Sequence, residues 1–141
     1  MKRLAQTTSQ PAQKALKVEN HDSRWQRIGS LLLFKSSIEG SKQGERKIAS
    51  FDLDCTLIKT KSGTVFARDE HDWQFLNNQV PATLQSFKEQ QYDIIIFTNQ
   101  NGLKNQEKID EFKRKISAIS KALDVNFTLL AALEKVSLKL T

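Results

Sequence analysis

The chain has 141 residues, a formal net charge of +6 and a single cysteine, Cys55. This length fits one domain with one hydrophobic core. A single cysteine excludes an internal disulfide and a four-cysteine metal site, and it fits a reducing compartment. No run approaches the roughly 18 apolar residues of a membrane helix, and the first residues lack the apolar stretch of a secretory signal.

The basic excess lies in the first third of the chain. Residues 1–50 hold 10 Lys/Arg and 4 Asp/Glu, whereas residues 51–141 hold 12 of each. Residues 1–24 are polar and have little to bury, so we predict a disordered basic tail over 1–24 and one domain over 25–141. Such a tail either attracts nucleic acid by releasing counterions or is an ordinary solvated segment, and both interpretations stay open here.

Hydrophobic patterns predict strands and helices in alternation after the tail. The predicted strands cover residues 25–34 (a strand or one arm of a hairpin), 48–51, 92–97 and 125–133. The predicted helices cover residues 81–91, with Pro81 in the first turn, and 105–122, where apolar residues recur at three- and four-residue steps. This order predicts an α/β fold with a doubly wound parallel sheet.

Two carboxylates follow a predicted strand directly, and a polar turn follows another. Asp52 and Asp54 come after residues 48–51, and Thr98 comes after residues 92–97. Because the carboxyl ends of parallel strands meet at one sheet edge, we expect these three residues to lie together. One carboxylate can attack phosphorus, a second can donate and accept the proton, and a hydroxyl can hold phosphoryl oxygens. A divalent cation, most simply Mg²⁺, would balance the charge.

The segment between the acidic pair and the first helix predicts a flap over this site. Gly63 marks a turn between two short extended arms within residues 59–66. Lys59, Lys61 and Lys104 flank the expected site and either touch DNA phosphates or are ordinary surface charges. Trp73 is interpreted as a packing residue rather than a platform for base stacking.

The motifs carry a family resemblance. Residues 51–57 (FDLDCTL) resemble the first motif of the haloacid dehalogenase superfamily of phosphotransferases, and Thr98 matches its second motif. FDLDCTLIKTKSGTVF, the Asp72-Trp73 pair and IIIFTNQNGL resemble the phosphatase domain of the polynucleotide kinase 3′-phosphatase family, fungal type, over residues 25–133. The resemblance implies a Rossmann-like parallel sheet and an enzyme of the nucleus that removes 3′-phosphates from broken DNA ends during repair.

The resemblance also implies a role for each site residue. Asp52 would be the nucleophile and Asp54 the general acid and base. Both would bind Mg²⁺, Asp52 through its side chain and Asp54 through its backbone carbonyl. Thr98 and Asn99 would bind the phosphate.

The sequence departs from the family pattern in three places. Cys55 stands where glycine is most usual, and we interpret it as a tolerated turn residue rather than a nucleophile. The family continues to a lysine in an Arg-Lys-Pro context and to a Gly-Asp-Ala-Ala-Gly-Arg motif, and neither occurs here. We therefore expect a family member shortened at its C-terminal side, with an incomplete sheet, an unrelated ending over 136–141, poor stability and weak or absent activity.

Two other functions stay open at this point. One is a phosphatase of a small metabolite, since histidinol-phosphate and heptose-bisphosphate phosphatases share DxDGT and TNQ-type motifs. The other is a non-catalytic remnant that binds DNA or a repair partner through its basic arm. Ser62-Gly63, Phe66 and Asp72-Trp73 favour the polynucleotide branch.

Overall fold

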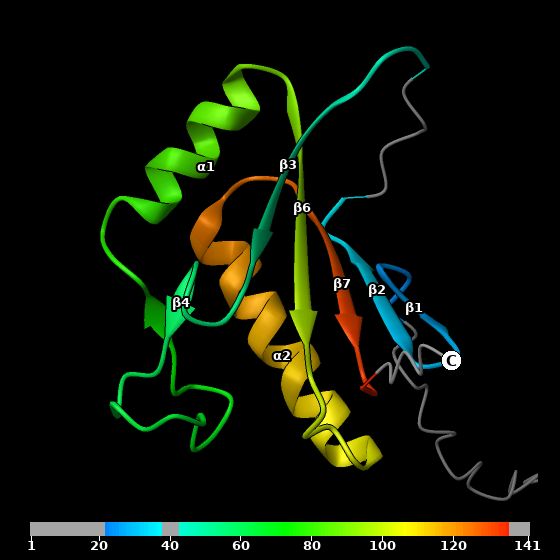
Figure 1. Cartoon of the computed structure of the whole chain (residues 1–141), viewed down its shortest axis with the longest axis vertical. Helices are drawn as coiled ribbons and strands as arrows, with labels where there is room; N and C mark the ends of the chain where they lie inside the picture. The colour runs from blue at the N-terminus through cyan, green and yellow to red at the C-terminus, as the bar shows by residue number, and fades with distance from the viewer. Residues whose placement is uncertain (1–21, 38–42, 136–141) are drawn as a thin grey trace, which may run out of the picture.

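The computed structural model describes residues 22–37 and 43–135, which form one five-stranded sheet, a two-stranded sheet and two helices (Figure 1). The elements are, in chain order, β1 (Trp25–Ile28), β2 (Leu31–Lys35), β3 (Lys47–Asp52), β4 (Ile58–Lys59), β5 (Gln74–Phe75), α1 (Val80–Glu89), β6 (Tyr92–Asn99), α2 (Gln106–Leu123) and β7 (Thr128–Ala132). The predicted tail over 1–24 and the ending over 136–141 fall largely outside the described residues.

The large sheet is mixed, with strand order β1-β2-β7-β6-β3. β3 pairs with β6 and β6 with β7, both in parallel, as predicted. β1 and β2 form an antiparallel hairpin that adds to β7 through β2, so the hairpin alternative for residues 25–34 is confirmed and the sheet as a whole is mixed rather than parallel. The reason is the short connection, where Gly29 adopts a φ of 58°, because a tight turn joins only antiparallel neighbours.

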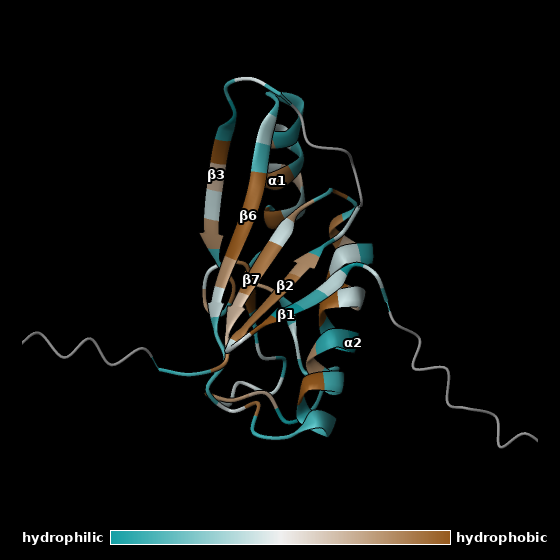
Figure 2. Cartoon of the chain, turned by 90° about the vertical axis from the view of Figure 1, so that its right-hand side faces the viewer, coloured by the Kyte–Doolittle hydropathy of each residue, from teal (hydrophilic) through white to brown (hydrophobic). Residues whose placement is uncertain are grey.

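Both helices of the described chain pack against the same face of the large sheet (Figure 2). Alternate strand positions on that face are fully buried, including Leu32, Leu129 and Ile96. On the opposite face Phe97 is 48% exposed and Ile48 is 56% exposed. A doubly wound sheet carries helices on both faces, so within residues 22–37 and 43–135 that part of the prediction does not hold.

Local signals set the helix boundaries. The Asn105 side chain accepts a hydrogen bond from the Lys108 backbone N–H (2.9 Å), which starts α2 one residue after the predicted start. Asp124 has a left-handed φ of 53° and ends α2, so β7 begins at Thr128 rather than at residue 125. Among the described helices, none has the length and apolar character to cross a membrane.

Candidate active site

The loop that follows β3, residues 53–57, is held by backbone hydrogen bonds, and we call it the motif loop. The Cys55 N–H donates to the Ile58 carbonyl (2.8 Å), and the Ile58 N–H donates to the Leu53 carbonyl (3.1 Å). Leu53 and Ile58 are both buried in the core. Asp52 at the end of β3 and Asp54 in the motif loop are exposed on either side of Leu53, so two carboxylates project from a fixed backbone.

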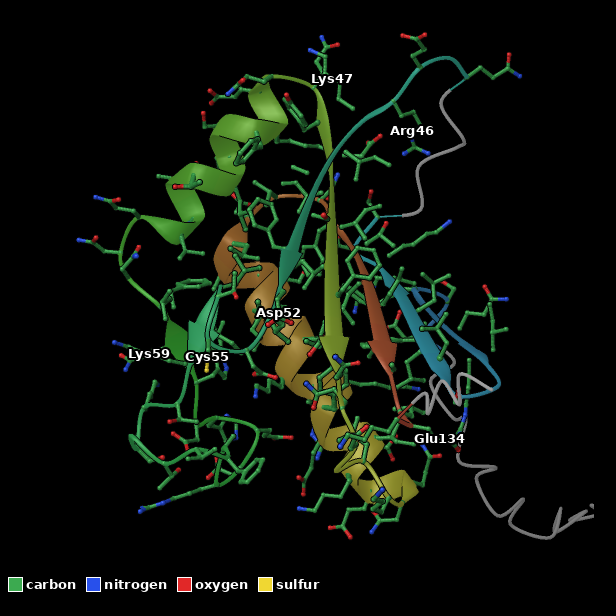
Figure 3. All side chains as sticks on the ribbon, viewed as in Figure 1. Arg46, Lys47, Asp52, Cys55, Lys59 and Glu134 are labelled. Carbon is green, nitrogen blue, oxygen red and sulfur yellow. The ribbon has the colours of Figure 1, made fainter. Side chains whose placement is uncertain are left out.

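The backbone conformation of Cys55 indicates why glycine is usual at this position. Its φ is 61°, in the left-handed region that favours glycine, and its thiol is exposed and free. Figure 3 shows Cys55 beside β4, apart from Asp52 at the tip of β3. The conformation is the physical reason why glycine suits this position and supports the interpretation of Cys55 as a turn residue.

The end of β6 lies beside the motif loop. Asp52 is paired with Phe97 across the parallel ladder, so Thr98 follows one residue beyond the level of Asp52. The side chain of Gln100 joins the two strand ends, because its Nε2 donates to Oδ2 of Asp54 (3.0 Å) and to Oγ1 of Thr98 (2.9 Å). The structure thus brings Asp54 and Thr98 to one amide group. Sequence reasoning missed Gln100, although the polar run Thr98-Asn99-Gln100 at a strand end was a signal for it.

The predicted site residues Asp52, Asp54, Thr98 and Asn99 all lie at this sheet edge, but not on the same face of the sheet. Thr98 is buried and lies on the helix-covered face, while Asn99 is exposed and alternates to the opposite face. Asp52 is level with Phe97 and therefore shares the face of Asn99. The edge is common to all four residues, and Gln100 directly joins Asp54 and Thr98.

Residues 60–72 form a second, longer loop, the flap loop. Its base is closed by β4 and β5, which pair Lys59 with Gln74 in antiparallel register. Of the predicted extended arms within residues 59–66, only Lys59 lies in a strand, β4; Gly63 lies inside the loop and has a positive φ of 78°. Only β4 and β5, at the base of the flap loop, form a backbone ladder. Residues inside the loop are held by side-chain hydrogen bonds instead.

One carboxylate anchors the flap loop. Asp72 is buried and accepts hydrogen bonds from the Arg68 N–H (2.9 Å), the Ser62 hydroxyl (2.7 Å) and the Ser62 N–H (2.8 Å). These donors, the Arg68 amide first, lower the pKa of Asp72 from about 3.8 to about 2. Asp72 therefore stays ionised at neutral pH and ties the two sides of the loop together.

The flap tip is open to solvent, and its far end is tied to α2. Val65 is 89% exposed and Phe66 is 84% exposed. Glu70 accepts from Nε of Arg114 on α2 at 2.6 Å. Trp73 packs edge-on against Phe75, with ring centroids 5.4 Å apart, which agrees with its predicted packing role.

A cleft of about 450 Å³ lies between the motif loop, the flap loop and α2. Asp54 and Gln100 line it, whereas Asp52, Thr98 and Asn99 are not among the lining residues. Its charged lining is mixed, with four cations and four further carboxylates: Lys59, Arg68, Lys108, Lys115, Asp69, Glu70, Asp72 and Glu111. Of the three lysines singled out from the sequence, only Lys59 lines the cleft. Sequence reasoning missed Lys108 and Lys115, although their spacing of seven residues places both on one face of α2.

The carboxylates of the site fit an open metal site rather than a closed one. Among residues 22–37 and 43–135 there is no cluster of three or more His, Cys, Asp and Glu side chains that could hold a metal. Mg²⁺ does not need one, since it binds one or two carboxylates and completes its shell with water and substrate phosphate. Asp52 and Asp54 fit such an open site and do not fit a closed metal cage.

Paired carboxylates at one strand end beside a hydroxyl at the next define a site suited to phosphoryl transfer. The family model described as polynucleotide kinase 3 phosphatase matches residues 47–139, which include both strand ends, the flap loop and α2. This match covers more than half of the sequence. The chain belongs to the polynucleotide kinase 3′-phosphatase family.

Individual relatives agree with that assignment. A bifunctional polynucleotide phosphatase/kinase of Schizosaccharomyces pombe is 38% identical over 113 residues, which is 79% of this chain and 27% of the relative. A polynucleotide 3′-phosphatase of Saccharomyces cerevisiae is 33% identical over 101 residues, 64% of this chain and 42% of the relative. The Arabidopsis thaliana polynucleotide 3′-phosphatase ZDP is 34% identical over 87 residues, which is 62% of this chain and 11% of the relative. The chain therefore spans less than half the length of these relatives.

Proposed function

We propose that this chain is a polynucleotide 3′-phosphatase that removes 3′-phosphates from DNA strand breaks during repair in the nucleus. The observation that carries the proposal is the pair of exposed carboxylates, Asp52 and Asp54, beside Thr98 at one sheet edge, with Gln100 joining the two strand ends. The names of the yeast and plant relatives give the substrate class.

We also propose that the sheet is a Rossmann-like sheet of the haloacid dehalogenase type. The parallel order β7-β6-β3, with one motif at the end of β3 and the other at the end of β6, supports this interpretation. In the described chain β3 has a neighbour on one side only. This open edge next to Asp52 supports the expectation that the sheet is incomplete.

The chemistry requires two steps. A carboxylate oxygen of Asp52 attacks phosphorus, the bond between phosphorus and the 3′ oxygen breaks, and protonated Asp54 gives its proton to the leaving oxygen. Ionised Asp54 then takes a proton from a water molecule, whose oxygen attacks the phosphorus of the aspartyl-phosphate. Inorganic phosphate leaves, and Asp52 and protonated Asp54 are restored. Thr98 and Asn99 are the proposed donors to the phosphoryl oxygens.

Mg²⁺ is the proposed cofactor, held by the Asp52 carboxylate and the Asp54 backbone carbonyl. When bound, it would neutralise charge on the phosphoryl group. The cleft lining is mixed in charge, because Lys59, Arg68, Lys108 and Lys115 lie there together with five carboxylates: Asp54, Asp69, Glu70, Asp72 and Glu111.

The test compares substrates and one matched pair of variants. A nicked duplex with a 3′-phosphate, the same duplex with a 5′-phosphate, and histidinol phosphate are supplied at equal concentration with Mg²⁺. We expect release from the 3′-phosphate alone, at the weak rate expected from the sequence, and binding to DNA that weakens steeply as salt is raised. Asp52→Asn should abolish release because an amide is not a nucleophile.

Asp124→Asn is the control for that variant. It makes the same chemical change at the C-terminal end of α2, where the left-handed φ of 53° suits asparagine as well as aspartate. Activity of the control should equal that of the parent chain. Faster, salt-independent release from histidinol phosphate would favour the small-metabolite phosphatase, and full activity of Asp52→Asn would refute the nucleophile assignment.

A further inference from the structure

We propose that Gln100 is a positioning residue: it decides which oxygen of Asp54 carries the transferred proton and in which direction the Thr98 hydroxyl donates. The assignment rests on the proposed function. Its geometric basis is the single Nε2 atom that lies 3.0 Å from Oδ2 of Asp54 and 2.9 Å from Oγ1 of Thr98.

The backbone of Gln100 is anchored, which fixes where its side chain starts. Its N–H donates to the carbonyl of Ala132 at the end of β7 (2.8 Å), and its carbonyl accepts from the Leu103 N–H (3.4 Å). The residue follows β6 directly and is half-buried. The side chain therefore reaches from the end of β6 to the motif loop after β3, 46 positions away in sequence.

Hydrogen-bond chemistry settles the orientation of the amide. The Nε2 atom of Gln100 faces both Asp54 and Thr98, and an amide nitrogen only donates. An amide nitrogen carries two hydrogens, and the same atom is within bonding distance of Thr98. One hydrogen serves each partner, and both donors of the amide are used.

This arrangement has a consequence for Asp54. Because Oδ2 is occupied as an acceptor, the proton of the neutral carboxyl sits on the other oxygen, Oδ1. Asp54 is exposed and lines the cleft, so Oδ1 is available to a leaving oxygen there. Gln100 thus excludes the proton from Oδ2 of Asp54 and holds the carboxyl group so that Oδ1 faces the cleft.

A second consequence concerns Thr98. Its hydroxyl accepts from Gln100, and a hydroxyl has only one hydrogen to donate. That hydrogen is left for another acceptor, and a phosphoryl oxygen at the same sheet edge is such an acceptor. The same amide therefore prepares both the proposed acid and the proposed phosphate ligand.

The discriminating variant is Gln100→Glu, which has nearly the same shape but replaces the donor nitrogen by an acceptor oxygen. Its carboxylate would repel Asp54 and would draw the Thr98 hydroxyl toward itself. Gln106→Glu is the matched control, because Nε2 of Gln106 also donates to an aspartate, Oδ1 of Asp110 (2.9 Å), on the exposed surface of α2. Both variants make the same substitution and the same charge change.

The kinetic readout is cleavage of the bond to phosphorus in a single turnover, with two oligonucleotides. One carries a normal 3′-phosphate, and the other a 3′-S-phosphorothiolate, whose sulfur leaves without needing a proton because a thiol has a pKa near 8.5. We expect Gln100→Glu to slow the oxygen substrate about 10²-fold and the sulfur substrate at least tenfold less. Equal slowing of both substrates, or equal behaviour of the Gln106→Glu control, would overturn the assignment.

A second readout does not depend on activity. The side-chain NH₂ signals of Gln100 are identified in an NMR spectrum by their disappearance in Gln100→Glu, and they are followed in Asp54→Ala and Thr98→Val. Both variants should shift these signals and leave the Gln106 pair in place, whereas unmoved signals would refute the hydrogen bonds. If the parent chain releases no phosphate from either substrate, the proposed function fails, and these shifts alone decide the contacts of Gln100.

Discussion

The motif loop and the flap loop border the same cleft but are stabilised by different means. In the motif loop, backbone groups bond to each other, and Leu53 fixes the turn in the core. In the flap loop, side chains do this work: Asp72 holds Ser62 and Arg68, and the Thr60 hydroxyl donates to the Thr64 carbonyl (2.6 Å).

This difference separates the two tasks of the site. Backbone bonds around a buried leucine do not titrate, so Asp52 and Asp54 keep their place over a wide range of conditions. The flap loop is held by side-chain bonds, chiefly those of Asp72 and Glu70, and its tip is exposed, so it can open without unfolding the core. Under the proposed function, the chemistry lies on the rigid motif loop and the end of β3, and access to it depends on the adjustable flap loop.

The largest expected effect is the loss of the anchor of the motif loop. Leu53→Ala removes a fully buried side chain, and we expect the free energy of unfolding to fall by about 2–5 kcal/mol. Urea unfolding followed by circular dichroism measures it. Val65→Ala, a truncation at the 89% exposed flap tip, is the control and should change stability by less than about 0.5 kcal/mol. A similar fall in the free energy of unfolding in both variants would show that the motif loop is no more firmly anchored than the flap loop.

Removing the anchor of the flap loop should affect activity more than stability. Asp72→Ala leaves the Ser62 and Arg68 donors without their acceptor, so the flap should no longer be held over the cleft. We expect kcat/KM on a 3′-phosphorylated nick to fall roughly tenfold, because small displacements of positioning groups cost up to about 10² in rate.

Asp110→Ala is the control for the flap anchor. Asp110 also accepts a side-chain hydrogen bond, from Gln106 on α2, but that bond lies outside the flap loop. Its activity should stay within about twofold of the parent, as for most surface changes. A melting temperature that falls as far in Asp72→Ala as in Leu53→Ala would show that Asp72 supports the core rather than the flap.

The two loops should also respond differently to acid. The pKa of Asp72 is lowered to about 2 from about 3.8, so its stabilising effect is complete above about pH 4 and is lost as pH falls toward 2. Hydrogen exchange of the Ser62 and Arg68 amides, corrected for intrinsic rates, should accelerate in that window. The Cys55 amide donates to a backbone carbonyl and serves as the internal control, and Asp72→Asn should abolish the dependence.

The smallest expected effect concerns two turns with positive φ. Cys55→Gly in the motif loop should stabilise the chain by about 0.5–1 kcal/mol, because relief of a left-handed strain of about 1–2 kcal/mol exceeds the entropy cost of glycine. Gly63→Ala in the flap loop is the reverse change and should destabilise by a similar amount. Calorimetry of both variants checks this, and loss of phosphatase activity in Cys55→Gly would contradict the assignment of Cys55 as a turn residue.

The sequence by itself determined the local elements. Periodicity located α2 to within one residue at each end and identified β3 and β6, because amphipathic spacing depends only on which neighbours along the chain must be buried. The polar residues directly after β3 and β6 were also readable, since parallel strands end at one edge. Asp52, Asp54 and Thr98 followed from that rule alone.

Tertiary structure decided what depends on distant partners. The β1–β2 hairpin joins β7, about 100 residues later in the chain, and no local pattern specifies that neighbour. Gln100 meets Asp54 across 46 positions, and Lys115 of α2 reaches the same cleft as Arg68 of the flap loop. Local pattern fixes which residues must be buried, whereas hydrogen bonds between loops depend on how the strands are ordered and packed, and only the folded chain sets that order.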